Sequence, residues 1–139
     1  MRNPIKTAVR ERPSPRTIGP VTQTDIVRFA GAGGDFNPLH HDPAFAASAG
    51  FEQPIAMGQM TAGLLAAWLT DWCGVENLRD YEVRFTAPLA IGDTVELSGE
   101  VMTVEPIEDD LALATLELAA TRGGTTLVAG RATVVVTTT

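Results

Sequence analysis

The stretch MGQMTAGLLAAWLTDW (residues 57–72) decides the fold of this chain, because it is apolar on almost every side of a helix. About 16 residues at 1.5 Å each make a rod of about 24 Å, long enough for the axis of a small domain but too short for a bilayer. Gly74 follows as a C-terminal stop. We therefore predict a buried central helix around which one domain is built.

After this helix the spacing of apolar residues changes from 3.6 to 2. Residues 80–88 and 94–101 each alternate between apolar and polar side chains, which is typical of half-buried strands. Ile91-Gly92-Asp93 forms the turn between these two segments. Pro106 and Asp109-Asp110 mark the next turn, so the second strand is expected to end before them.

Residues 111–121 are ambiguous, because their Ala, Leu and Glu favour a helix by intrinsic propensity. Strict apolar alternation favours a strand instead, and Gly123-Gly124 is a suitable two-residue hairpin turn into a last strand over residues 125–136. The pattern therefore predicts an α+β domain in which a four-strand antiparallel meander wraps the central helix.

Two short helices are expected before the central one. Thr22 or Thr24 is suited to cap the first, and Gly31 and Gly33-Gly34 end it. Asp-Pro at the start of residues 42–49 opens the second, with the aspartate as cap and the proline at the first helical position.

The loop between these helices, GGDFNPLH (residues 33–40), carries the candidate site. Its glycines and the Asn-Pro pair exclude a regular helix, so the loop can curl and bring Asp35 to His40. A carboxylate within hydrogen-bond reach of an imidazole can move a proton to or from water near neutral pH. Alternatively, Asp35 and Asn37 only cap the turn with their side chains. Spacing alone leaves both interpretations open.

The six residues DFNPLH (35–40), with Phe29 before and Ala46 after them, closely resemble the signature of the MaoC-like or R-specific enoyl-CoA hydratases, also called hydratase 2. The resemblance runs from about Thr22 to the last strand. It implies the hot-dog fold, an antiparallel sheet wrapped around one long central helix, usually paired into a dimer. The resemblance and the apolar pattern thus agree on a single hot-dog domain over residues 22–139.

The resemblance also implies an activity: a hydro-lyase that adds water to a trans-2-enoyl thioester to give the (R)-3-hydroxyacyl thioester, or catalyses the reverse dehydration. Asp35 and His40 would hold and activate the water. Gly58 would donate its backbone N–H to the thioester oxygen, since the first N–H groups of a helix lack intrahelical partners. Asn37 is expected to fix the loop, and Thr61 lies where a small hydroxyl residue of relatives approaches the thioester. No cofactor and no metal are expected.

This sequence departs from the family beside that glycine. Relatives commonly have His before it and Met after it, whereas here Met57 and Gln59 flank Gly58. The backbone donor is unaffected, but the neighbouring side chains differ. Without the resemblance, the glycine would be explained by simple crowding between helix and sheet.

Other functions and assemblies remain open at this stage. The resemblance implies an acyl-CoA or acyl-carrier-protein thioester as the substrate, and a homodimer is expected. One alternative is the catalytic subunit of a heterodimeric 3-hydroxyacyl-ACP or acyl-CoA dehydratase. A hot-dog acyl thioesterase is a further alternative, which the Asp-x-Asn-Pro-x-His signature argues against.

Charge and cysteine content set further limits. The net charge is −7, and half of the ten basic residues lie in residues 2–16, so the body of the chain is acidic and unsuited to nucleic acid. Cys73 is the one cysteine, which excludes an internal disulfide; with no expected membrane span or secretory signal, a cytoplasmic location is expected. Residues 1–21 are interpreted as an extended basic lead-in, which could alternatively fold back to meet coenzyme A phosphates or an acidic carrier protein.

Overall fold

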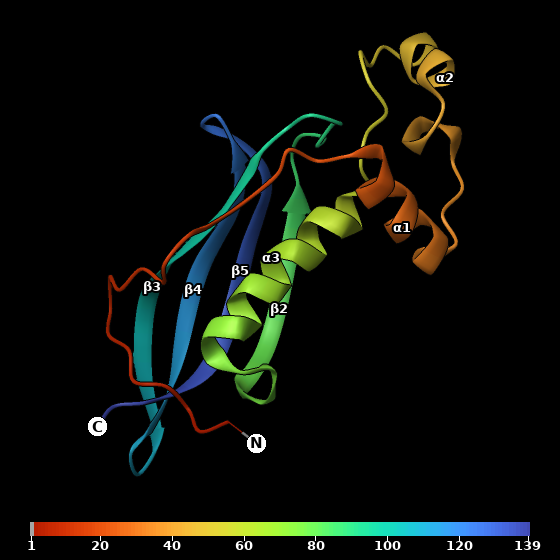
Figure 1. Cartoon of the computed structure of the whole chain (residues 1–139). Helices are drawn as coiled ribbons and strands as arrows, with labels where there is room; N and C mark the ends of the chain where they lie inside the picture. The colour runs from red at the N-terminus through yellow and green to blue at the C-terminus, as the bar shows by residue number, and fades with distance from the viewer. Residues whose placement is uncertain (1) are drawn as a thin grey trace.

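The computed structural model describes residues 2–139, and its strands form one antiparallel five-stranded sheet in the order β1-β3-β4-β5-β2. Helix α3 lies against one face of this sheet (Figure 1). Among the described residues, no helix combines the length and apolar character needed to cross a membrane. The elements in chain order are β1 (Arg16–Ile18), α1 (Gln23–Gly33), η1 (Pro38–His40), α2 (Pro43–Ser48), α3 (Gly58–Cys73), η2 (Val75–Asn77), β2 (Leu78–Phe85), β3 (Val95–Glu108), β4 (Leu111–Arg122) and β5 (Thr125–Thr137).

The alternation in β4 builds the core. Its even-numbered residues from Ala112 to Ala120 are buried toward α3, while the odd-numbered ones face outward and are partly or fully exposed. The strand predicted over residues 111–121 is therefore confirmed, despite its helical propensity. Gly123 and Gly124 both have positive φ, 53° and 84°, as a two-residue turn between twisted strands requires.

Helix α3 is buried or half-buried around most of its circumference, so the prediction of a buried central helix is confirmed. Leu65, Trp68 and Leu69 pack into the core, whereas Gly63 and Ala67 are exposed. The sheet covers one side of the helix, and the N-terminal segment contacts another side through the hydrogen bond from Trp68 to Ser14. The exposed residues recur at every fourth position, Gln59, Gly63, Ala67 and Asp71, and so form one narrow line along the helix.

The order of the strands differs from the predicted meander. Strand β2 pairs with β5, with Tyr81 opposite Ala132, and not with β3, which follows it in sequence. Strand β3 continues through Pro106, which was predicted to lie in the turn, and ends at Glu108, so the turn lies at Asp109-Asp110 as predicted. The register shifts between Pro106 and Glu108. Proline lacks an N–H to donate, and a bulge is one of the places where a strand tolerates it.

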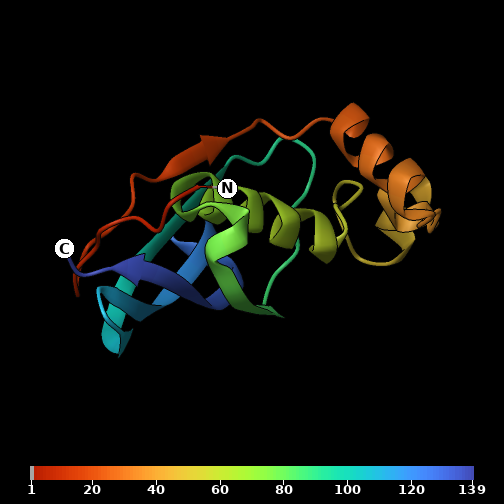
Figure 2. The same ribbon diagram turned by 90° about the horizontal axis from the view of Figure 1, so that it is seen from below.

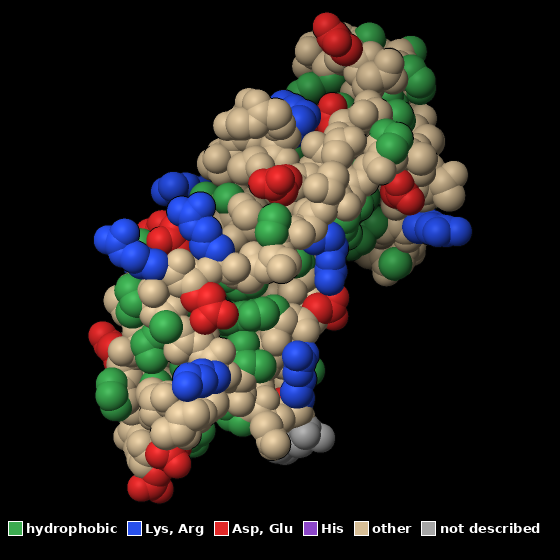
Figure 3. All heavy atoms as spheres, turned by 60° about the vertical axis from the view of Figure 1, so that its left-hand side comes forward, with side chains coloured by type: hydrophobic (Ala, Val, Ile, Leu, Met, Phe, Trp, Pro, Cys, Tyr) green, Lys and Arg blue, Asp and Glu red, His purple; other side chains and the backbone are tan. Residues whose placement is uncertain are grey.

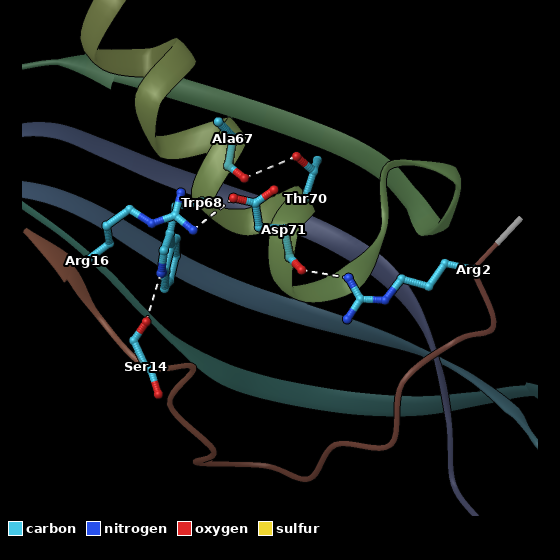
Figure 4. A network of polar contacts seen from close by, with 7 residues as sticks. All are labelled: Arg2, Ser14, Arg16, Ala67, Trp68, Thr70 and Asp71. Atoms are coloured by element: carbon cyan, nitrogen blue, oxygen red, sulfur yellow. Dashed lines mark hydrogen bonds and ion pairs between the residues drawn. The ribbon is translucent and has the colours of Figure 1, made fainter. Parts of the chain in front are cut away.

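The N-terminal segment packs against the domain instead of standing free. Strand β1 pairs with β3, and Arg10 N donates to Val101 O at 2.7 Å. Trp68 Nε1 donates to the carbonyl oxygen of Ser14 at 2.9 Å, which joins the segment to α3 (Figure 4). The expected extended lead-in is therefore extended, but it contributes an edge strand that the sequence analysis did not predict.

Three basic residues of this segment make polar contacts with the domain. Arg2 donates to the carbonyl oxygen of Asp71 at 2.6 Å, and Arg16 pairs with the Asp71 carboxylate at 2.8 Å, in the last turn of α3 (Figure 4). Arg12 pairs with Glu100 at 2.8 Å. On the face shown in Figure 3, basic and acidic side chains are interspersed. The segment is thus folded against the domain, and the alternative in which it meets coenzyme A phosphates or an acidic carrier protein stays a prediction.

Helices α1 and α2 and the turn η1 project beyond one end of the sheet (Figures 1 and 2). Thr22 caps α1, and its side chain and that of Asp25 exchange hydrogen bonds with each other's backbone N–H groups. Helix α1 continues past Gly31 and ends at Gly34, which has a φ of 71°. Asp42 caps α2 as expected. The candidate loop is thus held between two capped helices.

Candidate active site

The loop brings Asp35 and His40 into contact. Asp35 Oδ2 lies 3.2 Å from His40 Nε2. The backbone reverses because Asp35 N donates to Ala30 O at 3.1 Å at the end of α1, and residues 38–40 then form the 3₁₀ turn η1. The prediction that the curl of this loop joins the two side chains is confirmed.

Backbone groups hold the imidazole of His40 in place. Its Nδ1 lies 2.8 Å from the carbonyl oxygen of Ile55. Gln23 Nε2 donates to the carbonyl oxygen of His40 at 2.8 Å and ties the turn to the first residue of α1. The His40 side chain is 10% exposed and that of Asp35 is 48% exposed. The pair therefore consists of a fixed, buried imidazole and a carboxylate that faces solvent.

The turn-capping interpretation holds as well, for different atoms. Asn37 Oδ1 accepts a hydrogen bond from Leu39 N at 3.0 Å, so Asn37 fixes the loop as expected. Asp35 Oδ1 accepts from Asn37 N at 3.3 Å, while its Oδ2 faces His40. The two oxygens of the Asp35 carboxylate thus have different partners: Oδ1 stabilises the turn and Oδ2 contacts the imidazole.

Gly58 is the first residue of α3, and the helix start carries no side-chain cap. Among residues 2–139, neither Gly58 N nor Gln59 N has a hydrogen-bond acceptor, and the first bond of the turn runs from Met60 N to Met57 O at 3.0 Å. Helices α1 and α2, in contrast, have capping side chains. Two unpaired N–H groups at the positive end of a helix can bind a carbonyl oxygen that gains negative charge.

Gly58 and Gln59 line a pocket of about 350 Å³. Thr61, which is 3% exposed, lines it together with Gly58. Most of the other lining side chains are apolar or small. The full lining is Ile55, Ala56, Gly58, Gln59, Thr61, Phe85, Thr86, Ala87, Pro88, Leu89 and Val128.

Ile55 connects the two parts of the site. Its carbonyl oxygen contacts the imidazole of His40, and its N–H donates to Leu39 O at 3.0 Å. Ile55 also lines the pocket beside Gly58. Asp35 and His40 do not line that pocket. Within one protomer, Ile55 therefore connects them to the start of α3, because it contacts His40 and also lines the pocket. The arrangement can hold a proton-transfer pair near a carbonyl-binding N–H group.

Sequence reasoning missed three contributors. Ile55 acts through its backbone, which its apolar side chain does not reveal. Gln23 acts through a side-chain amide that reaches a backbone oxygen 17 residues away, which no local pattern marks. Phe85 follows the strand alternation onto the sheet face that bears α3, but its contact with Gly58 spans 27 residues of sequence, and no local pattern encodes it.

A sequence model described as MaoC like domain matches residues 3–122 of this chain. The chain belongs to the MaoC-like family. The match begins inside the segment that the sequence analysis set apart as a lead-in. It continues through the candidate loop, the central helix and most of the sheet.

Individual members of the MaoC-like family agree with this assignment. The (R)-specific enoyl-CoA hydratase of Aeromonas caviae is 35% identical over 113 residues, which cover 79% of this chain and 82% of the relative. The solved (R)-hydratase from A. caviae involved in PHA biosynthesis superposes with a TM-score of 0.78 at 29% identity, covering 94% of this chain and 97% of that one. A chain of the ChsH1-ChsH2 complex from Mycobacterium tuberculosis gives a TM-score of 0.79 at 25% identity, covering 94% and 98%. The predicted hot-dog fold is confirmed.

Proposed function

We propose that this chain is a hydro-lyase that adds water to a trans-2-enoyl thioester to give the (R)-3-hydroxyacyl thioester, and catalyses the reverse dehydration. The contact between Asp35 Oδ2 and His40 Nε2 carries this proposal, because hydration needs one group to take a proton from water and another to supply one to carbon. The likeness to enzymes named as (R)-specific enoyl-CoA hydratases supports the choice of substrate and product.

The hydrogen bond to Ile55 decides how the imidazole works. A carbonyl oxygen only accepts, so His40 Nδ1 carries the hydrogen and Nε2 of the neutral ring presents a lone pair to Asp35. Asp35 Oδ2 and His40 Nε2 are then two hydrogen-bond acceptors 3.2 Å apart. Such a pair is stabilised by a proton shared between the two atoms, or by a water that donates one hydrogen to each. In the proposed reaction that water gives one proton to the pair as its oxygen bonds to the β carbon. The pair then returns a proton to the α carbon, so that no proton is gained or lost overall.

Gly58 would stabilise the enolate formed between these two steps. As the oxygen adds to the β carbon, negative charge develops on the thioester oxygen. The unpaired N–H groups of Gly58 and Gln59 can bind this oxygen. Removing one such donor costs about 3 kcal/mol in comparable sites. Thr61 lies in the same pocket and would contact the thioester.

The assembly and the carrier are part of the proposal. A homodimer is favoured, and the likeness to a chain of the ChsH1-ChsH2 complex keeps a heterodimer with a second hot-dog subunit as the alternative. The presence of the Asp35–His40 pair would then mark this chain as the catalytic half. Coenzyme A or an acyl carrier protein is the carrier, and the single cysteine is in keeping with a cytoplasmic location.

The test is to mix the purified protein with crotonyl-CoA and with a longer trans-2-enoyl-CoA. Loss of enoyl-thioester absorbance would be followed, and the configuration of the 3-hydroxy product determined. We expect turnover to the (R) product by the wild type and a kcat/KM lower by about 10²-fold or more in Asp35→Asn. Asp42→Asn is the matched control, because asparagine caps a helix as well as aspartate and Asp42 only caps α2.

Release of free coenzyme A from a saturated acyl-CoA, without hydration, would support the thioesterase alternative and contradict the proposal. Equal turnover by wild type and Asp35→Asn would also contradict it, since the pair would then have no part in the reaction. Size-exclusion chromatography with light scattering, on protein purified from its own host, distinguishes a homodimer from a complex with a second subunit.

A further inference from the structure

Phe85 is an exposed aromatic residue in an unusual place. It is the last residue of β2, opposite Val128 on the sheet face that bears α3, yet the residue is 50% exposed. Large apolar side chains on the inner face of a sheet are normally covered. Phe85 lies at the pocket beside Gly58, whose lining it forms in part.

The ring of Phe85 packs directly on Gly58. A Cβ atom placed on Gly58 would lie 2.8 Å from Phe85 Cδ1, 2.9 Å from Cε1 and 3.2 Å from Cγ. Those distances leave no room for a methyl group, so the ring covers the glycine Cα. Crowding therefore does explain why a glycine is needed here, because a Cβ atom would meet the ring. The N–H of Gly58 nevertheless has no acceptor among the described residues.

Phe85 is also the largest side chain in the lining. Its neighbours there include Ala56, Thr61 and Ala87, which leave space near the helix start. The ring is consequently the main steric wall beside the unpaired N–H groups. Whatever carbonyl binds those groups must bring its next atoms past this ring.

We propose that Phe85 is a specificity-determining residue that excludes acyl groups branched at the α carbon. This inference rests on the proposed function, in which the thioester oxygen binds Gly58 N–H. The α carbon is the acyl atom bonded to the carbonyl carbon, so a substituent on it lies nearest to a ring that covers Gly58. An unbranched trans-2-enoyl group passes the ring, whereas a methyl branch at the α carbon meets it.

The experiment compares kcat/KM for crotonyl-CoA and for its α-methyl derivative, 2-methylcrotonyl-CoA, in wild type, Phe85→Leu and Phe85→Ala. We expect the wild type to prefer crotonyl-CoA. In the Ala variant the ratio should move toward the branched substrate by about tenfold or more, in line with the 10- to 200-fold that one methylene is worth in a fitted pocket. Phe85→Leu, which keeps an apolar wall and protects against a folding failure, should give a smaller shift in the same direction.

Phe45→Ala is the matched control, because Phe45 is an aromatic residue of α2 with 44% exposure and does not line the pocket. Its substrate ratio should equal that of the wild type. An unchanged ratio in both Phe85 variants, with normal circular dichroism spectra, would overturn the inference, and so would equal use of both substrates by the wild type. Failure of the wild type on crotonyl-CoA would instead mean that the proposed function itself is wrong.

Discussion

The carbonyl oxygen of Ile55 lies 2.8 Å from His40 Nδ1, and this contact determines which nitrogen of the ring faces Asp35. The acceptor belongs to the backbone of the connector before α3, so its direction is set by the chain itself. The same residue lines the pocket beside Gly58. Ile55 is therefore shared by the two parts of the site: its carbonyl oxygen contacts the imidazole, and the residue lines the pocket.

We expect Asp35 and His40 to behave as one unit in kinetics. Each of Asp35→Asn and His40→Ala should lower kcat/KM for crotonyl-CoA by about 10²- to 10⁴-fold, the usual contribution of general acid–base catalysis. The double variant should be no worse than the poorer single variant, because removing either partner already abolishes the shared water. Steady-state kinetics on the three variants tests this.

His41→Ala provides the control for the histidine change, since His41 is the exposed neighbour of the buried His40. It should retain wild-type turnover. Multiplicative losses in the double variant would show that the two residues act in separate steps, and would argue against a water held between them.

The contact between Gly58 and Phe85 predicts a compensating pair of substitutions. Gly58→Ala keeps the backbone N–H but introduces a Cβ within 3 Å of the Phe85 ring, so kcat/KM should fall as the ring or the helix start is displaced. Adding Phe85→Ala removes the clash. In a double-mutant cycle the combined variant should therefore be less impaired than the two single losses predict.

Both substitutions would be followed by thermal unfolding as well as by kinetics, because relief of the clash should also appear as a recovered melting temperature. Strictly additive effects in both measurements would mean that the ring moves aside freely. A ring that moves aside for a methyl group on Gly58 would also move aside for a branched acyl group, which would argue against Phe85 as a specificity-determining residue.

Much of the fold could be predicted because the signals are local. Alternation over residues 111–121, the turn at Gly123-Gly124 and the cap at Asp42 each depend on a few neighbouring residues, and all three agree with the structure. The turn that joins Asp35 to His40 is local too. Strand order was predicted wrongly because the pairing of β2 with β5 depends on packing around α3. The apolar periodicity of a strand does not indicate which other strand it pairs with.

The site was predictable only where it is continuous in sequence. The roles of Ile55 and Gln23 depend on backbone oxygens and on a side chain that reaches 17 residues along the chain. The contact of Phe85 with Gly58 needs the sheet and α3 to be assembled first. Resemblance to a family supplied Gly58 and Thr61, which the pattern alone would have left as packing residues.

Tyr81 offers a direct spectroscopic test of the packing between β2 and α3. Its hydroxyl donates to Ala62 O at 2.7 Å, and burial raises the pKa of Tyr81 to about 12. It is the only tyrosine in the chain, so the near-ultraviolet absorbance of tyrosinate reports on this residue alone. We expect an absorbance midpoint near pH 12 in the folded protein and about 10 in denaturant.

The pKa of Tyr81 also predicts a change in stability. Because the folded state raises this pKa above the unfolded value, the neutral form is favoured by folding. The contribution is fully present below about pH 10 and is lost as the pH rises toward about 12. Tyr81→Phe should remove this part of the alkaline decline. A folded-state midpoint near 10 would mean that the hydroxyl is solvated and that β2 packs more loosely than described.

Two polar contacts at the C-terminal end of α3 should differ in their value to stability. Asn77 is 5% exposed, and its Nδ2 donates to Cys73 O at 2.7 Å and to Arg2 O at 3.3 Å. Asn77→Ala leaves the last carbonyl of α3 buried without this partner, so the free energy of unfolding should fall by about 1 to 3 kcal/mol. The measurement is the urea midpoint at constant m value.

Asp71→Ala is the comparison, since its carboxylate pairs with Arg16 at 2.8 Å but the side chain is 64% exposed (Figure 4). Solvent screens such a pair, and its loss should change the free energy of unfolding by less than about 1 kcal/mol. Its backbone carbonyl, which accepts from Arg2, is unaffected by the substitution. Equal losses in the two variants would show that the N-terminal segment holds α3 through its ion pair, and that the buried amide of Asn77 is not the stronger anchor.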